Sequence, residues 1–189
     1  VFVVDYGWSR SAMDKRTHPD KFPSGMRALS DYVHSLGMKF GIWVASAAFD
    51  PGLAPTKDPE EWFVRLEDGS IHDEGMIAGK CACLASGYKD YFIEELNGIM
   101  DRYKVDWLKY DQNMFFNCYA KGHKHQNEHD APYFQSLAFY EILDDVIKRH
   151  PDLLVECALS GAMILDYGIL RRSNAVNLTD DYRSYFLRR

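Results

Sequence analysis

Lys109 and Asp111 stand two residues apart at the end of the apolar stretch VDWLKYDQN, which spans residues 105–113. The large apolar and aromatic residues of this stretch are typical of a β-strand. In a strand, side chains two positions apart point to the same side. An ammonium and a carboxylate that converge at a strand end form either a structural ion pair or part of an active site.

A second acidic pair, Asp180 and Asp181, follows another short apolar run. Glycoside hydrolysis requires two carboxyl groups that flank one bond, about 5–5.5 Å apart for retention of configuration and about 6.5–9.5 Å apart for inversion. Asp111 and Asp180 can supply these groups, and Lys109 would keep Asp111 ionised, as a nucleophile requires. The alternatives are a structural pair for Lys109 and Asp111, and capping of a following helix by the second acidic pair.

Strand-like runs alternate with helical segments along the chain. We expect strands at residues 1–4, 38–45, 81–85, 105–110, 153–158 and 175–179. We expect amphipathic helices at 22–37, 87–103 and 133–150, and shorter ones at 58–66 and 163–173. Such alternation indicates parallel strands joined by crossover helices, hence an α/β fold.

The predicted fold is a (β/α)8 TIM barrel with about six of its eight βα units present. A complete barrel needs about 250 residues, and this chain has 189. A doubly wound open sheet is the alternative, but no GxGxxG or GxxxxGK[ST] follows the first strand. We expect residues 1–189 to be part of a catalytic barrel domain in a longer protein. Unpaired edge strands would make the isolated piece unstable or prone to aggregate.

Polar residues cluster just after the predicted strands, where a barrel places its active site. They are Asp5, Trp8, Arg10, Ser46, Asp111, Asn113, Glu156, Asp180 and Asp181.

Composition excludes some partners. The formal net charge is −6 and no block of basic residues occurs, so nucleic acid and anionic membranes are not expected partners. No run of eighteen apolar residues exists, so we expect no transmembrane helix. The chain begins within a strand and without Met, so its localisation cannot be inferred from its ends.

The cysteine and histidine patterns do not predict a metal site. Cys81, Cys83, Cys118 and Cys157 include one C-x-C pair without a second close pair, so buried thiols are expected rather than a closed zinc site. The stretch HKHQNEHD contains His123, His125, His129 and Asp130. We interpret it as a solvated loop or a hydroxyl-binding rim and predict neither a metal nor another cofactor. A metal-assisted hydrolase that uses these histidines is the rival interpretation.

Four motifs, in order along nearly the whole chain, resemble the α-galactosidase clan, closest to glycoside hydrolase family 36 and the raffinose synthase group. DYGW resembles that family's D-D-G-W, and HPDKFPSGMRALSDYVHSLGMKFGIW resembles K-F-P-x-G-L … G-x-K-F-G-L-W. LKYDQN resembles the K-W-D-x-N nucleophile strand, and LTDDY resembles the S-D-x-x-D or S-D-D-F acid/base segment.

The resemblance implies a retaining α-glycosidase that acts on terminal α-linked galactose or a related sugar of an oligosaccharide. Asp111 would be the nucleophile and Asp180 the general acid/base. Lys109 and Asp5 would bind sugar hydroxyls, and Trp43 would pack on the apolar face of the sugar.

Further residues of the site follow from position. Trp8, Asn113, Asp181 and Arg183 are candidate sugar-contacting residues. The family resemblance also implies flanking N-terminal and C-terminal β domains outside this chain, through which the protein could oligomerise.

The chain departs from the family pattern in several places. The stretch WVASAAF lacks the E-P-E that commonly follows Trp43, and three positions carry other residues. Tyr6 replaces a second aspartate, Ala158 a cysteine and Ile164 an arginine. The alternatives are therefore a raffinose-synthase-type transglycosylase and a non-catalytic carbohydrate-binding relative.

Overall fold

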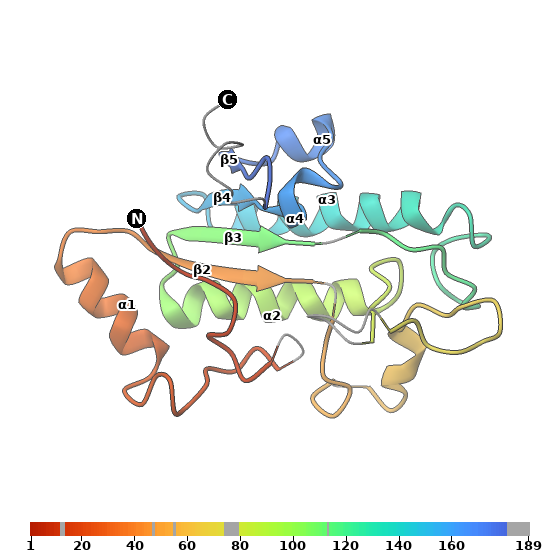
Figure 1. Cartoon of the computed structure of the whole chain (residues 1–189), viewed down its shortest axis with the longest axis horizontal. Coiled ribbons are helices and arrows are strands. Elements are labelled where there is room, and N and C mark those ends of the chain that lie inside the picture. The colour runs from red at the N-terminus through yellow and green to blue at the C-terminus, as the bar shows by residue number, and fades with distance from the viewer. Residues whose placement is uncertain (12–13, 47, 55, 74–79, 113, 181–189) are drawn as a thin grey trace.

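A five-stranded parallel sheet forms the centre of the protein, in the strand order β1-β2-β3-β4-β5 (Figure 1). The computed structural model describes residues 1–11, 14–46, 48–54, 56–73, 80–112 and 114–180. The strands are β1 Phe2–Val4, β2 Phe40–Ala45, β3 Trp107–Asp111, β4 Leu154–Cys157 and β5 Ala175–Val176. Because every strand runs parallel to its neighbours, all the carboxyl ends lie at one edge of the sheet.

Helices connect these strands, as the alternation of patterns predicts. They are α1 Met26–Ser35, α2 Tyr88–Tyr103, α3 Ala131–Arg149, the short α4 Leu159–Ala162 and α5 Tyr167–Leu170, with a 3-10 turn η1 at Pro59–Trp62. Helices α2 and α3 run side by side along the sheet (Figure 1). The predicted α/β class with a parallel sheet is thus confirmed, but the sheet is open rather than closed into a barrel.

One predicted strand is wrong. Residues 81–85 join no sheet strand and instead form an isolated antiparallel bridge between Phe63 and Ala82. The amide of Cys83 donates to the Trp62 carbonyl oxygen over 2.8 Å, and the Val64 amide donates to the Cys81 carbonyl oxygen over 2.9 Å. Small side chains in this segment contribute little strand preference of their own, so local pairing with residues 62–64 decides its conformation.

The hydrophobic core lies between the sheet and its two long helices. Leu108, Tyr110 and Val155 are fully buried and belong to one cluster with Phe92 of α2 and Phe139 of α3. The ring of Tyr110 stacks between the other two rings, with centroids 4.7 Å from Phe139 and 6.0 Å from Phe92. Burial of these aromatic rings is a large part of the stabilisation of the sheet on its helices.

The opposite face of the sheet carries the polar side chains. On β3, Leu108 and Tyr110 are buried, whereas Trp107, Lys109 and Asp111 are only half-buried. Side chains alternate between the two faces of a strand, so these three residues point away from α2 and α3. The sequence pattern therefore places Lys109 and Asp111 on the face of the sheet opposite α2 and α3.

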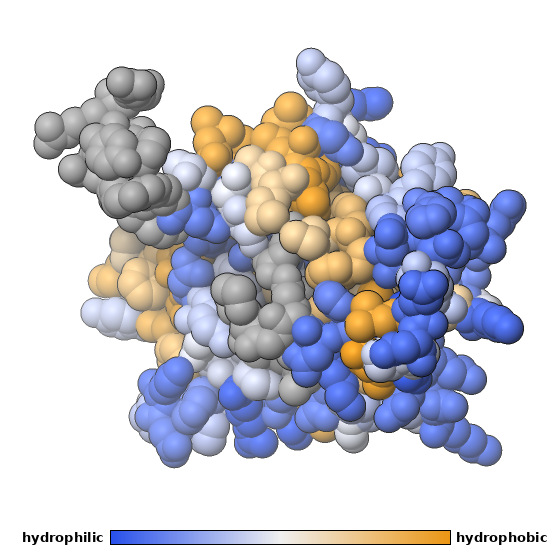
Figure 2. Space-filling view, turned by 45° about the vertical axis from the view of Figure 1, so that its right-hand side comes forward, coloured by the Kyte–Doolittle hydropathy of each residue, from blue (hydrophilic) through white to orange (hydrophobic). Residues whose placement is uncertain are grey.

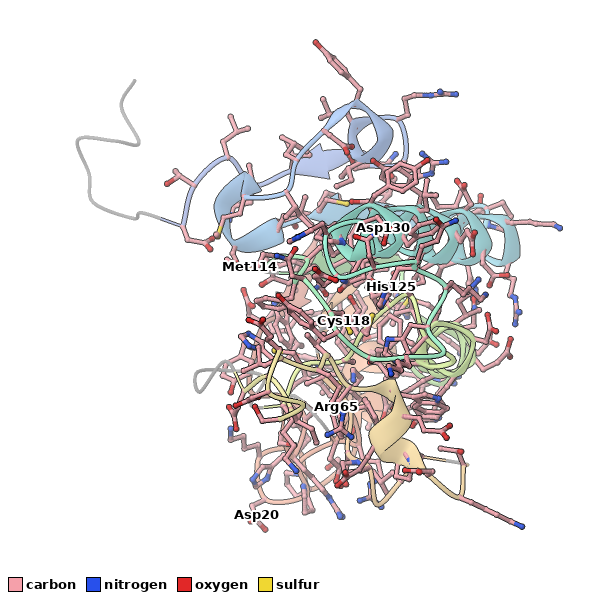
Figure 3. The ribbon with its side chains drawn as sticks, turned by 90° about the vertical axis from the view of Figure 1, so that its right-hand side faces the viewer. Asp20, Arg65, Met114, Cys118, His125 and Asp130 are labelled. Carbon is pink, nitrogen blue, oxygen red and sulfur yellow. The ribbon has the colours of Figure 1, made fainter. Side chains whose placement is uncertain are left out.

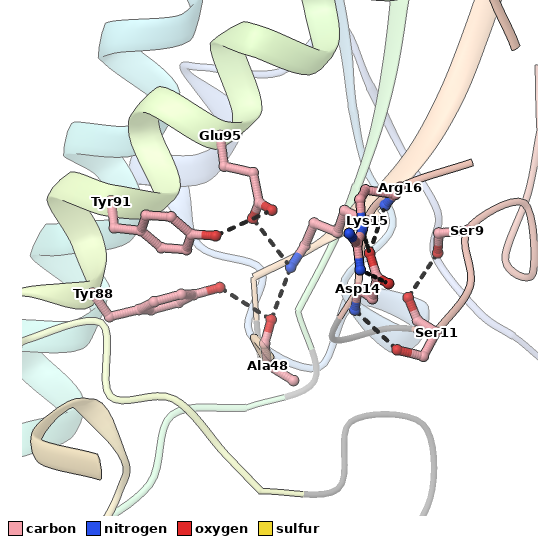
Figure 4. A network of polar contacts seen from close by, with 9 residues as sticks. All are labelled: Ser9, Ser11, Asp14, Lys15, Arg16, Ala48, Tyr88, Tyr91 and Glu95. Carbon is pink, nitrogen blue, oxygen red and sulfur yellow. Dashed lines mark hydrogen bonds and ion pairs between the residues drawn. The ribbon is translucent and has the colours of Figure 1, made fainter. Parts of the chain in front are cut away.

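A buried lysine fixes the segment that follows β1. Figure 4 shows the Lys15 ammonium between the Ala48 carbonyl oxygen, at 2.8 Å, and the Glu95 carboxylate, at 3.5 Å. Tyr88 also donates to the Ala48 carbonyl oxygen, and Tyr91 donates to Glu95. Burial lowers the pKa of Lys15, and the charge of Glu95 opposes that shift. The network ties the segment after β1 to helix α2.

The surface is mainly hydrophilic in the lower and right-hand parts of Figure 2. Apolar side chains gather in the upper part of the same view, where α4, α5 and β5 lie. Among the described residues, no helix combines the length and the apolar character that a membrane crossing requires.

Candidate active site at the carboxyl ends of the strands

Asp111, the last residue of β3, has both carboxylate oxygens held by N–H donors. Trp43 on the neighbouring strand β2 donates from its indole Nε1 to Oδ2 over 3.2 Å. The backbone amide of Ser160 in α4 donates to Oδ1 over 2.9 Å. Donors on two different oxygens fix the rotation of a carboxyl group. Asp111 is thus an oriented carboxylate at the strand ends.

The turn that presents the Ser160 amide is left-handed. Leu159, Ser160, Gly161 and Ala162 have φ angles of 53°, 47°, 75° and 69°. The left-handed region costs roughly 1–2 kcal/mol for each residue other than glycine. Such runs persist only where the surroundings impose them, and they concentrate at functional sites. The unusual backbone therefore belongs to the positioning of Asp111.

Lys109 lies two residues before Asp111 on the same face of β3 and forms an ion pair with Asp5. The distance from the Lys109 Nζ to the Asp5 Oδ2 is 2.7 Å. The side chain of Asp5 is 58% exposed and that of Lys109 is 15% exposed, so the carboxylate is accessible to a ligand. Lys109 pairs in register with Trp43 on one side and Glu156 on the other. The ammonium of Lys109 is thus paired with Asp5, and Glu156 is its register neighbour on β4.

Asp180 lies in the segment after β5, two strands from Asp111 across the sheet. Asn177 donates from Nδ2 to the Asp180 Oδ1 over 2.8 Å. The backbone of this segment packs tightly against the left-handed turn. A Cβ atom placed on Gly161 would lie 2.7 Å from the amide nitrogen of Asp180 and 3.0 Å from the Cα of Thr179. The same turn therefore contacts both acidic residues, through Ser160 on one side and Gly161 on the other.

The structure places Trp8, a predicted site residue, in the core, so its contact with a ligand stays a prediction. Its side chain is 2% exposed and belongs to the core, and its indole donates to the Trp43 carbonyl oxygen over 2.6 Å. The chain turns at Gly7, where φ is 94°, and this turn directs the indole inward. Trp8 thus supports the end of β2 from within the core.

Trp43 is 5% exposed, and the edge of the Tyr6 ring packs against it with a centroid distance of 5.2 Å. Its stacking on a sugar stays a prediction, and its observed role is to donate to Asp111. Asn113, Asp181 and Arg183 lie outside the residues that the structure describes, so their roles also stay predictions.

Two contacts of the site were missed by sequence reasoning. The Ser160 amide contact depends on backbone conformation, for which the S-G pair at 160–161 is a weak signal. The indole of Trp107 donates to the Glu156 carboxylate over 2.8 Å, a diagonal contact between β3 and β4. That contact depends on the register between β3 and β4, which cannot be read from the sequence.

The arrangement is suited to chemistry with two carboxylates. One oriented carboxylate, a second acidic residue across the sheet, and a lysine ion-paired to an exposed aspartate can act as a nucleophile, a proton donor and a hydroxyl-binding group.

Comparisons with known proteins identify relatives of this chain. The Melibiase family matches residues 1–184. Among curated proteins, the chain is 26% identical over 187 residues to an alpha-galactosidase of Escherichia coli, covering 95% of this chain and 26% of that protein. It is 27% identical over 186 residues to an alpha-galactosidase of Lactobacillus acidophilus, covering 89% of this chain and 24% of that protein.

The fold resembles that of solved structures in the same group. The alpha-galactosidase AgaA of Geobacillus stearothermophilus superposes with a TM-score of 0.81 at 20% identity, over 94% of this chain and 26% of that one. A variant of AgaA in complex with raffinose superposes with a TM-score of 0.80 at 20% identity, with the same coverage. The chain spans about a quarter of the length of these relatives. The resemblance drawn from the four motifs is thereby confirmed.

Proposed function

The chain belongs to the Melibiase family, and from that premise we propose that it supplies part of the catalytic barrel of a retaining α-galactosidase. The observation that carries the proposal is the Asp111 carboxylate, which two N–H donors from different elements orient at the carboxyl end of β3. Active sites of (β/α)8 barrels lie at this end of the strands.

In the proposed reaction, Asp180 protonates the glycosidic oxygen while Asp111 attacks the anomeric carbon. The leaving group departs with that proton, and a galactosyl ester of Asp111 forms. Asp180 then removes a proton from water, which attacks the anomeric carbon and releases galactose with its original configuration. The donors from Trp43 and Ser160 stabilise the carboxylate that is regenerated in this second step.

We assign the binding of the terminal sugar to the row of charged residues beside Asp111. Lys109 and Asp5 can exchange their mutual contact for contacts with sugar hydroxyls, because the Asp5 carboxylate is exposed. Asn113, Asp181 and Arg183 remain candidates for further contacts. Variants of AgaA are solved in complex with raffinose and with stachyose. We accordingly propose oligosaccharides with a terminal α-linked galactose as the substrate class.

We also propose that the complete protein closes the barrel around this sheet. The missing βα units would pair with β1 and β5, which are the two edge strands of the described sheet, and β domains would flank the barrel. Unpaired edges of a parallel sheet are sites of non-specific association.

The test uses the complete protein and a fluorinated α-galactosyl fluoride, which forms a glycosyl-enzyme that hydrolyses slowly. Peptide mass spectrometry should find the label on Asp111, and Asp111→Asn should lower kcat by roughly 10⁴-fold or more, as loss of a nucleophile does. The matched variant Asp180→Asn should still accept the label, because departure of fluoride needs little protonation, but it should hydrolyse natural oligosaccharides poorly. A label on another residue, or full activity in Asp111→Asn, would refute the assignment.

A further inference from the structure

Four side chains with metal-binding chemistry converge between the loop after β3 and the segment before α2. Cys83, Cys118, His123 and His125 each offer one ligand atom, and these atoms all lie within 4.8 Å of one another. We call these four residues the cysteine–histidine cluster. Figure 3 shows Cys118 and His125 close together on the face that the strand ends point toward. Three members come from the loop after β3, and Cys83 comes from the segment before α2.

The His123 ring is oriented as a metal ligand would be. Its Nε2 lies 2.6 Å from the Glu61 carbonyl oxygen, which can only accept a hydrogen bond, so Nε2 carries the proton. Its Nδ1 then bears the lone pair and faces the Cys118 Sγ at 3.5 Å. Histidine ligands of metals characteristically donate their other ring nitrogen to a backbone carbonyl or a carboxylate in this way.

The His125 ring contains a nitrogen that the described part of the protein leaves unsatisfied. Its Nε2 is buried and has no hydrogen-bond partner there. A buried polar atom without a partner typically costs about 1–3 kcal/mol. The His123 and His125 rings meet edge to face, with centroids 5.4 Å apart. A bound cation would remove this cost and would account for two histidines and two thiols in one place.

The surroundings of the cluster are apolar and firmly held. Cys83 and Cys118 are fully buried in a small core cluster with Val64, Ala85 and Ala131. The Lys124 amide donates to the Ala85 carbonyl oxygen over 2.7 Å, and the Tyr119 amide donates to the Arg65 carbonyl oxygen over 2.9 Å. The loop after β3 is thereby fixed to the segment that contains Cys83 and to the segment around Arg65 that pairs with it.

We propose that the cysteine–histidine cluster binds one Zn²⁺ ion in a closed, four-coordinate structural site. Two thiolates and two imidazoles are a common ligand set of structural zinc, with Zn–S distances of about 2.3 Å and Zn–N distances of about 2.0–2.1 Å. Ligand atoms around a tetrahedral ion at those distances are about 3.3–3.8 Å apart, so separations of up to 4.8 Å need only a modest contraction. Both thiols lose their protons on binding.

The consequence for the protein is a fixed loop after the strand that carries Asp111. The ion would join this loop to the segment before α2, and its four protein ligands leave no open position for a substrate. The sequence-based expectation of no closed zinc site considered the C-x-C pair of Cys81 and Cys83. The fold uses only Cys83 of that pair and joins it to Cys118. The inference is independent of the proposed function.

The experiment measures zinc in the complete protein, produced without a polyhistidine tag and dialysed against metal-free buffer. Elemental analysis should find one zinc ion per chain. Replacement by cobalt(II) should give the strong visible absorption of a tetrahedral site together with thiolate charge-transfer bands. Cys118→Ser and His125→Ala should each lower zinc affinity by more than the roughly 10–100-fold that loss of an outer partner costs.

Two control variants are matched by residue type, and the cysteine control is also matched by burial. Cys81→Ser removes a buried thiol two residues from Cys83, and His129→Ala removes an exposed histidine of the same loop. Both should keep one zinc ion per chain, as should Asp111→Asn, which separates this site from the catalytic assignment.

Three results would overturn the proposal. The first is purified protein that contains no zinc and does not bind added zinc. The second is zinc retention in Cys118→Ser and His125→Ala. The third is a Cys83–Cys118 disulfide found by mass spectrometry in protein purified without reductant. The cobalt spectrum of the unmodified protein decides the matter even if the variants fail to fold.

Discussion

Gly161→Ala tests whether the left-handed turn positions Asp180, the proposed acid/base residue. The added Cβ would lie 2.7 Å from the amide nitrogen of Asp180, whereas ordinary contacts begin at 3.4 Å. All three nearest atoms belong to the backbone of Thr179 and Asp180, which cannot move aside as a flexible side chain would. The segment after β5 must therefore shift by about 0.7 Å. A displacement of about 1 Å can cost 10²-fold in rate, so we expect kcat/KM to fall about 10- to 100-fold.

A matched glycine separates this steric effect from backbone strain. Gly37 has a φ of 72°, close to the 75° of Gly161, and a Cβ there would meet no atom within 4 Å. Gly37→Ala should thus carry the same left-handed cost of roughly 1–2 kcal/mol in stability and leave kcat/KM unchanged. Urea unfolding measures the first quantity for both variants.

The kinetic assay compares two leaving groups in the complete protein. In the proposed mechanism, an oligosaccharide needs protonation by Asp180 when its glycosidic bond breaks, whereas a dinitrophenyl galactoside needs little. If Gly161→Ala displaces Asp180, the loss in kcat/KM should be about tenfold or more on the oligosaccharide and clearly smaller on the dinitrophenyl substrate. Equal losses on the two substrates, or a loss matched by Gly37→Ala, would refute the reasoning.

Two further predictions concern stability. Phe139→Ala removes a fully buried ring that stacks on the core of the sheet, and urea unfolding should show a loss of about 3–5 kcal/mol. Tyr133→Ala on the same helix, at 62% exposure, should change stability by about 0.5 kcal/mol or less. Burial is the larger cause, and a hydrogen bond donated to Asp166 the second, of a rise in the pKa of Tyr140 from 10.0 to about 12. Burial, together with the charge of Glu95, likewise raises the pKa of Tyr91 to about 12. The folded state then holds protons that the unfolded state has lost, so the free energy of unfolding should fall between about pH 10 and pH 12. Tyr140→Phe should weaken this fall when unfolding is measured across that range, and a rise in stability with pH would contradict the assignment.

The sequence predicted the elements whose patterns are long and regular. Helices α2 and α3 and strand β3 lie where their periodicity placed them, because each buries one face against the same core. The segment at 81–85 was mispredicted because its alanine and cysteine side chains are compatible with several conformations. Its backbone pairs instead with residues 62–64, and such non-local pairing is not visible in a short pattern.

The candidate site was predictable only in part, for a similar reason. Alternation along β3 predicted that Lys109 and Asp111 share a face, and the structure confirms it. The partners of Asp111 depend on strand register and on a left-handed turn, which residue types specify weakly. The burial of Trp8 depends on one turn at Gly7. The cysteine–histidine cluster unites Cys83 with residues of a distant loop, and only the fold brings them together.

The left-handed turn at residues 159–162 has a consequence for how the protein can change. Its conformational cost is incurred once, when the chain folds, and not in each catalytic cycle. Substitutions that relax this turn would therefore raise thermal stability while they loosen the donor that holds Asp111. In this one segment, a gain in stability would come with a loss in turnover. Laboratory selection for heat resistance alone would tend to erode activity first at this turn, through its contacts with Asp111 and Asp180.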